Sequence, residues 1–287
     1  MVYNIRRMIR EPAVSGTFYP RDAKTLTHDI EQYLSDAAPA EIQGDIKGLI
    51  APHAGYMYSG PVAAWGYKAL SGRRYDTVIV LAPSHRSYFS VAAVQDRGGY
   101  RTPLGVVEID EGFASDLLRQ GGPIISDAHA HREEHSLEVQ VPFLQYVLKD
   151  FRLVPIIMGA HDVELCEELA SALLRAMEDG TKQFLVVGST DLSHYYPYRH
   201  AVELDSHVVE RLDRFDVHGF VEDLASEKCE ACGAGPIITT MMATRQMGAD
   251  AARVLRYANS GDVSGDKATV VGYVSCVFYK KGVARDG

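Results

Sequence analysis

IKGLIAPHAGYMYSGP, residues 46–61, holds an apolar strand that ends abruptly at a proline and a histidine. The same ending follows a second apolar run, DTVIVLAPSHR at 76–86, so that His53 and His85 lie 32 residues apart. A separation of this length suits one β-α-β crossover, and we therefore expect the two strands to run parallel in one sheet. Proline cannot donate a hydrogen bond to a neighbouring strand, so it ends strand pairing just before each histidine.

A third apolar run, QFLVVGSTDLSHYY at 183–196, ends in the same manner with a carboxylate and a histidine. In an open α/β sheet, ligands bind in the crevice at the carboxyl ends of the strands. We therefore expect the three runs to bring four side chains together at one edge of the sheet, namely His53, His85, Asp191 and His194. One such histidine alone can equally be a hydrogen-bonded turn residue, but three similar endings favour a site.

The rest of the chain alternates strands and helices. Expected helices cover 22–36, 59–71, 111–119, 136–149, 162–178, 200–213 and 235–247. Expected strands cover 46–51, 76–82, 91–94, 152–158 and 183–189, followed by two antiparallel strands at 251–260 and 268–280. Near-continuous apolar strands between helices indicate an α/β fold with a largely parallel central sheet flanked by helices. Because no low-complexity tract or long linker interrupts it, we interpret 1–287 as a single domain.

Composition and charge exclude several classes of function. The net charge of −9 argues against nucleic acid or an anionic membrane as the main partner. No apolar run approaches the roughly 20 residues of a membrane helix, and the basic start of the chain lacks the apolar stretch of a secretory signal. We therefore expect a cytoplasmic protein whose four cysteines are reduced. A special cysteine would then bind a metal, act as a nucleophile or take part in redox chemistry.

Two imidazoles together with a carboxylate or thiolate form the ligand set of a catalytic or redox metal site. Cys232 is the thiolate candidate, because CEAC at 229–232 is followed by a glycine-rich stretch and a predicted helix. The amino terminus of that helix is expected to lower the pKa of Cys232 and favour the thiolate. A bare CxxC pattern is a weak signal, since it can be half of a zinc site, a redox pair or neither.

HREEH at 131–135 matches the HxxEH pattern of inverted zinc peptidases. That mechanism needs both histidines on one face of a regular helix. Here the pattern lies in a polar stretch, AHAHREEHS, that precedes the apolar helix, so we do not expect His131 to be in helical register. His135 is instead interpreted as a pocket residue at the helix entrance, paired with Glu138 one turn later.

Several of these motifs, taken in order along the chain, resemble the Memo family, whose fold is similar to that of class III extradiol dioxygenases of the LigB type. The resemblance runs through PAVSGTFYP (12–20), APHAGYMYSGP (51–61), LAPSHR (81–86), EEHSLEVQVPFL (133–144), STDLSHY (189–195) and CGAGPI (232–237). It implies a metal pocket that comprises His53, His85 and Cys232, with Asp191, His194 and His135 beside them. In the related dioxygenases two histidines and a glutamate hold a non-haem Fe(II). Here Cys232 or Asp191 takes the place of that glutamate, which favours metal binding over dioxygenase activity.

The leading hypothesis is a cytoplasmic metal-binding protein with an oxidoreductase-type site, and catalytic turnover is left open. If the site is catalytic, Fe(II) and O₂ would oxidise an aromatic or other small substrate. The expected catalytic residues are His194, His135 and Asp191: a histidine would move protons, and Asp191 would bind the metal or orient a ligand. Fe(II) and Cu are the expected metals and Zn is a further candidate, because thiolate-containing sites suit all three.

Two other classes of function remain. One is a scaffold that recognises a peptide in the pocket without turnover. The other is a hydrolase in which Cys232 is the nucleophile and His194 the base. Three tyrosines could line the pocket, namely Tyr56, Tyr58 and Tyr195. The expected partner is a small aromatic substrate or a peptide, with neither nucleic acid nor membrane, and a homodimer is one option for the oligomeric state.

Overall fold

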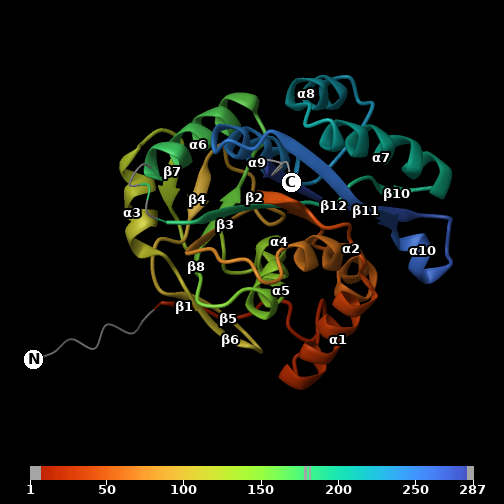
Figure 1. Cartoon of the computed structure of the whole chain (residues 1–287), viewed down its shortest axis with the longest axis horizontal. Coiled ribbons are helices and arrows are strands. Elements are labelled where there is room, and N and C mark those ends of the chain that lie inside the picture. Colours follow the sequence, from red (N-terminus) through yellow and green to blue (C-terminus); the bar gives the residue numbers. More distant parts are fainter. Residues whose placement is uncertain (1–7, 178–179, 181, 283–287) are drawn as a thin grey trace, which may run out of the picture.

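The computed structural model describes residues 8–177, 180 and 182–282. Its main sheet has nine strands, β2 (Gly44–Ala51), β3 (Thr77–Pro83), β4 (Ala92–Val94), β7 (Ile124–Ser126), β8 (Arg152–Met158), β9 (Phe184–Ser189), β10 (His194–Tyr196), β11 (Ala251–Asn259) and β12 (Val270–Lys281). They lie in the order β10-β12-β2-β9-β3-β8-β4-β7, and β11 pairs with β12 outside this path (Figure 1). A second sheet contains β1 (Ile9–Arg10), β5 (Gly99–Thr102) and β6 (Gly105–Glu108).

The centre of the main sheet is parallel, as predicted. Strands β2, β9, β3 and β8 are neighbours in this order and all three pairs are parallel. On either side the pairing becomes antiparallel, between β12 and β2 and between β4 and β8. The two strands with the Ala-Pro ending, β2 and β3, are therefore parallel but separated by β9. Because β9 carries the third ending, all three endings lie next to one another at one edge.

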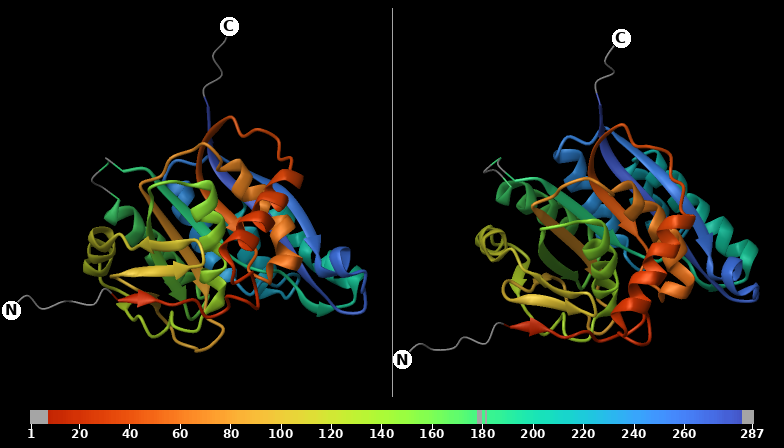
Figure 2. Two further views of the ribbon diagram at one scale, coloured as in Figure 1. Left: turned by 90° about the horizontal axis from the view of Figure 1, so that it is seen from below. Right: turned by 60° about the horizontal axis from the view of Figure 1, so that its bottom comes forward.

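Ten helices accompany these strands in the described part of the chain: α1 (Ala23–Asp36), α2 (Tyr56–Ala69), α3 (Glu111–Arg119), α4 (His135–Glu138), α5 (Gln140–Val147), α6 (Val163–Ala176), α7 (Tyr198–Asp213), α8 (Val217–Ala225), α9 (Ala234–Gln246) and α10 (Ser260–Ser264). Alternate residues of each central strand enter two hydrophobic clusters. Leu49 of β2 belongs to the cluster that includes residues of α1, α2, α4 and α5, whereas Ile50 belongs to the cluster that includes residues of α3, α6, α7, α8 and α9. The sheet is thus covered on both faces (Figures 1 and 2).

Differences from the prediction concern short elements and the nine-residue helix α8, which was not predicted. The helix expected over 136–149 is divided at Val139 into α4 and α5. The second sheet and β7 were not predicted, because strands of two to four residues are too short to show periodicity. Among the described residues, no helix combines the length and the apolar character that crossing a membrane requires.

Candidate metal centre

Three histidines converge at the carboxyl ends of the parallel strands. His53 follows β2, His85 follows β3, and His135 is the first residue of α4. Their ring centroids are 5.1 Å apart for His53 and His85, 4.6 Å for His85 and His135, and 5.6 Å for His53 and His135. One possible ligand atom from each ring lies within 4.8 Å of the other two. The three side chains are close enough to hold one metal ion between them.

Ser189, the last residue of β9, determines which nitrogen of His53 carries the proton. The Ser189 hydroxyl donates to the Ser136 carbonyl at 2.7 Å and accepts from the Gln140 side-chain amide at 2.7 Å. Its one proton is then used, so at 3.0 Å from His53 Nδ1 it can only accept. His53 is therefore protonated at Nδ1, and its Nε2 keeps the lone pair that a metal needs.

Glu134 has the same effect on the ring of His85, and its carboxylate also lies beside His135. Its Oε1 lies 3.0 Å from His85 Nδ1 and 3.3 Å from His135 Nδ1, and its Oε2 accepts the backbone N–H of His85 at 2.6 Å. Burial opposes ionisation of Glu134, but hydrogen bonds from His85 and Ser136 lower its pKa to about 2. A carboxylate only accepts hydrogen bonds, so the His85 ring carries its proton on Nδ1 and leaves Nε2 free.

Two of the imidazoles, those of His53 and His135, are favoured in their neutral form. Burial lowers the pKa of His53 well below its usual value, and the nearby charges of His85, His135 and His194 lower it further. Burial also lowers the pKa of His135 to about 4. A neutral imidazole is the form that binds a metal, so these shifts favour binding near neutral pH.

Cys232 lies beside this group, directly before α9. Its Sγ is 3.2 Å from His53 Nε2, and it accepts the backbone N–H of Asp191 at 3.2 Å. The predicted lowering of its pKa by the helix amino terminus is wrong. Burial of the sulfur raises the pKa of Cys232, and the nearby carboxylate of Asp191 raises it further, since both outweigh the helix dipole.

Asp191 and His194 occupy different positions relative to the centre. Asp191 is buried, its Oδ1 accepts the backbone N–H of His53 at 2.8 Å, and its Oδ2 lies 3.9 Å from His53 Nε2. Burial raises the pKa of Asp191 to about 7. His194 donates from Nδ1 to the Leu192 carbonyl at 2.7 Å and lies to the side of the three clustered rings. The structure therefore joins His135, and not His194, to His53 and His85.

The HREEH segment does not form a peptidase site. His131 lies in a turn, where its Nε2 donates to the Ala93 carbonyl at 2.9 Å and its Nδ1 accepts from the Tyr100 hydroxyl at 2.5 Å. The predicted pairing of Glu138 with the pocket is also wrong. The Glu138 carboxylate is bound by Arg10 and by the backbone around PAVSGTFYP, because the four-residue α4 turns it toward that segment.

Sequence reasoning missed Glu134 and Ser189 as supports of the site. Both lie within motifs that carry the Memo resemblance, EEHSLEVQVPFL and STDLSHY. The only local signal for Glu134 is its position directly before His135. No local signal shows that Ser189 contacts His53, because the two are 136 residues apart and meet only in the folded sheet.

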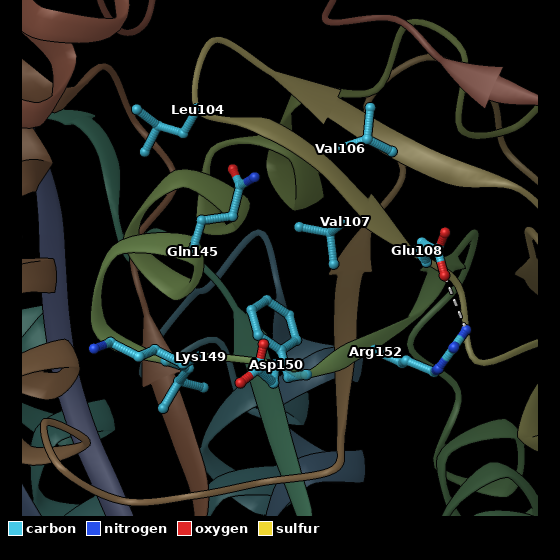
Figure 3. Close-up of a pocket in the computed structure, with 10 residues that line it drawn as sticks. Leu104, Val106, Val107, Glu108, Gln145, Lys149, Asp150 and Arg152 are labelled. Carbon is cyan, nitrogen blue, oxygen red and sulfur yellow. Dashed lines mark ion pairs between the residues drawn. The ribbon is translucent and has the colours of Figure 1, made fainter.

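A hollow of the surface lies away from the histidines (Figure 3). This cavity of about 600 Å³ is lined by β6, the end of α5 and the start of β8. Its polar rim includes Lys149, Asp150 and an ion pair of 3.2 Å between Glu108 and Arg152. Because Arg152 begins β8, the cavity is at the amino ends of the parallel strands, opposite the histidines.

Comparison with known proteins identifies the family. The family model for Memo-like proteins matches residues 10–277. A MEMO1 family protein from Methanopyrus kandleri is 42% identical over 280 residues, covering 94% of this chain and 99% of the relative. One from Methanothermobacter thermautotrophicus is 40% identical, covering 93% and 99%. The crystal structure of an uncharacterized protein from Escherichia coli K12 shares the fold alone, with a TM-score of 0.52 and 13% identity over 80% of this chain and 99% of that one. The chain therefore belongs to the Memo-like protein family, as its motifs predict.

Proposed function

We propose that this chain is a metal-binding protein whose centre is formed by His53, His85 and His135. One observation carries the proposal: hydrogen bonds to Ser189 and Glu134 hold the Nδ1 protons of His53 and His85, and the same Glu134 carboxylate lies 3.3 Å from His135 Nδ1. Such bonds fix the orientation of metal-binding imidazoles and leave Nε2 as the ligand atom. The side chain of His85 is 30% exposed, so the centre is accessible from solvent.

Cys232 and Asp191 would stand beside the bound metal. The predicted ligand set of His53, His85 and Cys232 thus shares two members with the three-histidine group, and Cys232 offers a fourth ligand. A metal ion favours deprotonation of a thiol that coordinates it, and this would offset the raised pKa of Cys232. Imidazoles with one thiolate suit Fe(II), Cu and Zn, of which we expect Fe(II) or Cu.

An oxidoreductase-type function fits this set of groups, with a small aromatic substrate as the expected partner. A redox metal with an accessible position would supply electron transfer and polarise bound oxygen atoms. Asp191 provides a buried carboxyl group whose pKa of about 7 suits proton transfer near neutral pH. All four cysteines are free, which is consistent with our placement of the protein in the reducing cytoplasm.

Metal content tests the proposal. The protein is purified without oxygen, and iron, copper and zinc are measured by mass spectrometry. We expect about one metal ion per chain in the wild type and a loss of most of it in His135→Ala. His194→Ala is the matched control, because His194 lies nearby but outside the three-ring group, and it should retain its metal.

Two outcomes would contradict the proposal: a wild type without any of the three metals, or equal metal loss in His135→Ala and His194→Ala. The hydrolase alternative is tested in the same preparations. An activity that survives chelation but not Cys232→Ser would favour it. The structure gives that alternative little support, since Cys232 contacts His53 rather than the predicted base His194.

A further inference from the structure

The prolines of the two Ala-Pro endings have the same type of hydrogen-bond partner. Pro52 directly follows β2 and Pro83 is the last residue of β3, so each lies one or two residues before a histidine of the centre. The Gln140 side-chain amide donates to the Pro52 carbonyl at 2.9 Å, and the Ser136 hydroxyl donates to the Pro83 carbonyl at 2.7 Å. Both donors are buried. Because an unpaired buried carbonyl is costly, these two side chains stabilise the turns in which the strands end.

The third ending is joined to the same two residues. The Ser189 hydroxyl accepts from the Gln140 amide and donates to the Ser136 carbonyl, both at 2.7 Å. Ser136 belongs to α4 and Gln140 begins α5, four residues later, so the two lie about one helical turn apart. One turn of the α4–α5 segment therefore holds the ends of β2, β3 and β9 together.

The turns that carry His53 and His85 are held from both sides. Their backbone N–H groups donate to Asp191 at 2.8 Å and to Glu134 at 2.6 Å. The two proline carbonyls fix the chain just before each histidine. Metal ligands must be held within about 0.5 Å of their productive positions, and residues beyond a strand end lack the ladder of hydrogen bonds that would hold them. Loss of a bond on either side is expected to widen the range of positions open to the imidazole.

We propose that Ser136 and Gln140 are positioning residues of the metal centre. Gln140 fixes the turn that carries His53. Ser136 fixes the turn that carries His85. The inference rests on the proposed metal centre and adds to it two residues that bind no metal. Within the described part of the chain, neither side chain has a hydrogen bond to an imidazole. Each therefore acts on its histidine through the backbone, and Gln140 acts also through Ser189, which accepts the Nδ1 proton of His53.

The first test compares zinc affinity with stability in Ser136→Ala and Gln140→Met. Competition with a chelator of known affinity should show a dissociation constant raised about 3–30-fold in each, below the roughly 10–100-fold expected for loss of a direct partner of a ligand. Tyr75→Phe is the matched control, because the buried Tyr75 hydroxyl donates to the Ile46 carbonyl at 3.0 Å, near the amino end of β2. Metal-free Ser136→Ala and Tyr75→Phe should both melt about 2–8 °C lower, since each leaves a buried carbonyl unpaired. Only Tyr75→Phe should keep its zinc affinity within about twofold.

The second test needs no metal. Nitrogen-15 NMR of histidine-labelled, metal-free protein at about pH 8, where an ordinary histidine is neutral, distinguishes protonation at Nδ1 from protonation at Nε2. In the wild type we expect His53 and His85 to be protonated at Nδ1. Gln140→Met should move the ring signals of His53 toward the average of the two forms and leave those of His85 unchanged. Ser136→Ala should do the reverse, and Tyr75→Phe should move neither.

Three results would overturn the inference. One is zinc affinity that stays within about twofold of the wild type in both variants. Another is an equal loss of affinity in Tyr75→Phe, which would mean that any destabilisation weakens the site. The third is unchanged histidine spectra in both variants. If Gln140→Met does not fold, Ser136→Ala, which removes a single hydroxyl, decides the matter alone. A wild type that binds no zinc would instead contradict the proposed centre, while the metal-free spectra would still show whether the two side chains position the rings.

Discussion

The two ends of the parallel strands differ in what their polar groups do. At the carboxyl ends, three imidazoles face one another, and the buried groups Ser189 and Glu134 hold the ring protons of His53 and His85. At the amino ends, the cavity of Figure 3 is spacious, but its charged groups lie on an exposed rim, where Glu108 and Arg152 pair with each other. A candidate site is therefore better recognised by converging donor atoms with buried support than by the size of a hollow.

The support of the histidine centre extends to the start of the described chain. Arg10 of β1 donates to the backbone carbonyl of Glu134 at 2.7 Å and to that of His131 at 2.9 Å, and it forms an ion pair with Glu138. All of these groups are buried. Arg10 thus fixes both ends of the segment that delivers Glu134 and His135 to the centre.

Arg10→Ala should have the largest effect on stability. The change leaves the buried carboxylate of Glu138 without its cation, which costs about 3–5 kcal/mol of the free energy of unfolding. Urea denaturation of metal-free protein measures this cost directly. A loss of less than about 1 kcal/mol in the free energy of unfolding would show that Glu138 is neutralised or hydrated without Arg10. The buried groups at the carboxyl ends would then contribute little more to stability than the exposed groups at the amino ends.

Lowering the pH should reduce the free energy of unfolding, and His131 should account for part of this loss. Burial lowers the pKa of His131 to about 4, whereas an unfolded histidine titrates near about 6.5. Between these values the unfolded chain binds a proton that the folded chain does not. The stabilisation is therefore complete above the unfolded pKa and declines as the pH falls, by about 3 kcal/mol at roughly pH 4.

This prediction is measured as the free energy of unfolding across the acid range. His131→Gln should show a shallower decline than the wild type, because the titrating group is gone. The control is His218→Gln, which removes a histidine whose side chain is 84% exposed. Equal slopes in the wild type and His131→Gln would contradict the prediction.

Much of the fold could be predicted because its signals are local. The strands β2, β3 and β9 are continuous apolar runs, and the residues that end them are visible in the sequence. Their convergence follows from the rule that parallel strands share one edge. The second sheet could not be predicted, since the two residues of β1 pair with β5 about ninety positions later.

The site was predicted less completely, for a physical reason. Recognisable motifs contain His53, His85 and His135. The atoms that hold the ring protons come from Ser189, which is distant in the sequence, and from Glu134, which the sequence pattern does not single out. The pKa of Cys232 likewise depends on contacts that the local sequence does not reveal. A local argument from the helix dipole predicts a lower value, whereas burial and Asp191, which depend on the whole fold, raise it.

Glu134→Gln should weaken metal binding by about 10–100-fold, because loss of a partner that orients metal-binding histidines has effects of this size. The amide keeps the shape of Glu134, but only one of its two terminal atoms can accept, so it cannot accept from both the ring and the backbone N–H of His85. Competition with a chelator of known affinity measures the change. Glu108→Gln at the cavity is the matched control and should not alter affinity. A change within about twofold for Glu134→Gln would contradict the assigned role.

Arg152→Ala should have the smallest effect. The side chains of Arg152 and Glu108 are 56% and 40% exposed, so water solvates both charges and their pairing contributes only about 0.2–1 kcal/mol. Urea denaturation should show a loss within this range, and metal affinity should be unchanged because the pair lies at the far end of the strands. A loss as large as that of Arg10→Ala, or a clear fall in metal affinity, would mean that the cavity is coupled to the centre. The two ends of the parallel strands would then act as one functional unit, and the large cavity would have to be considered part of the site.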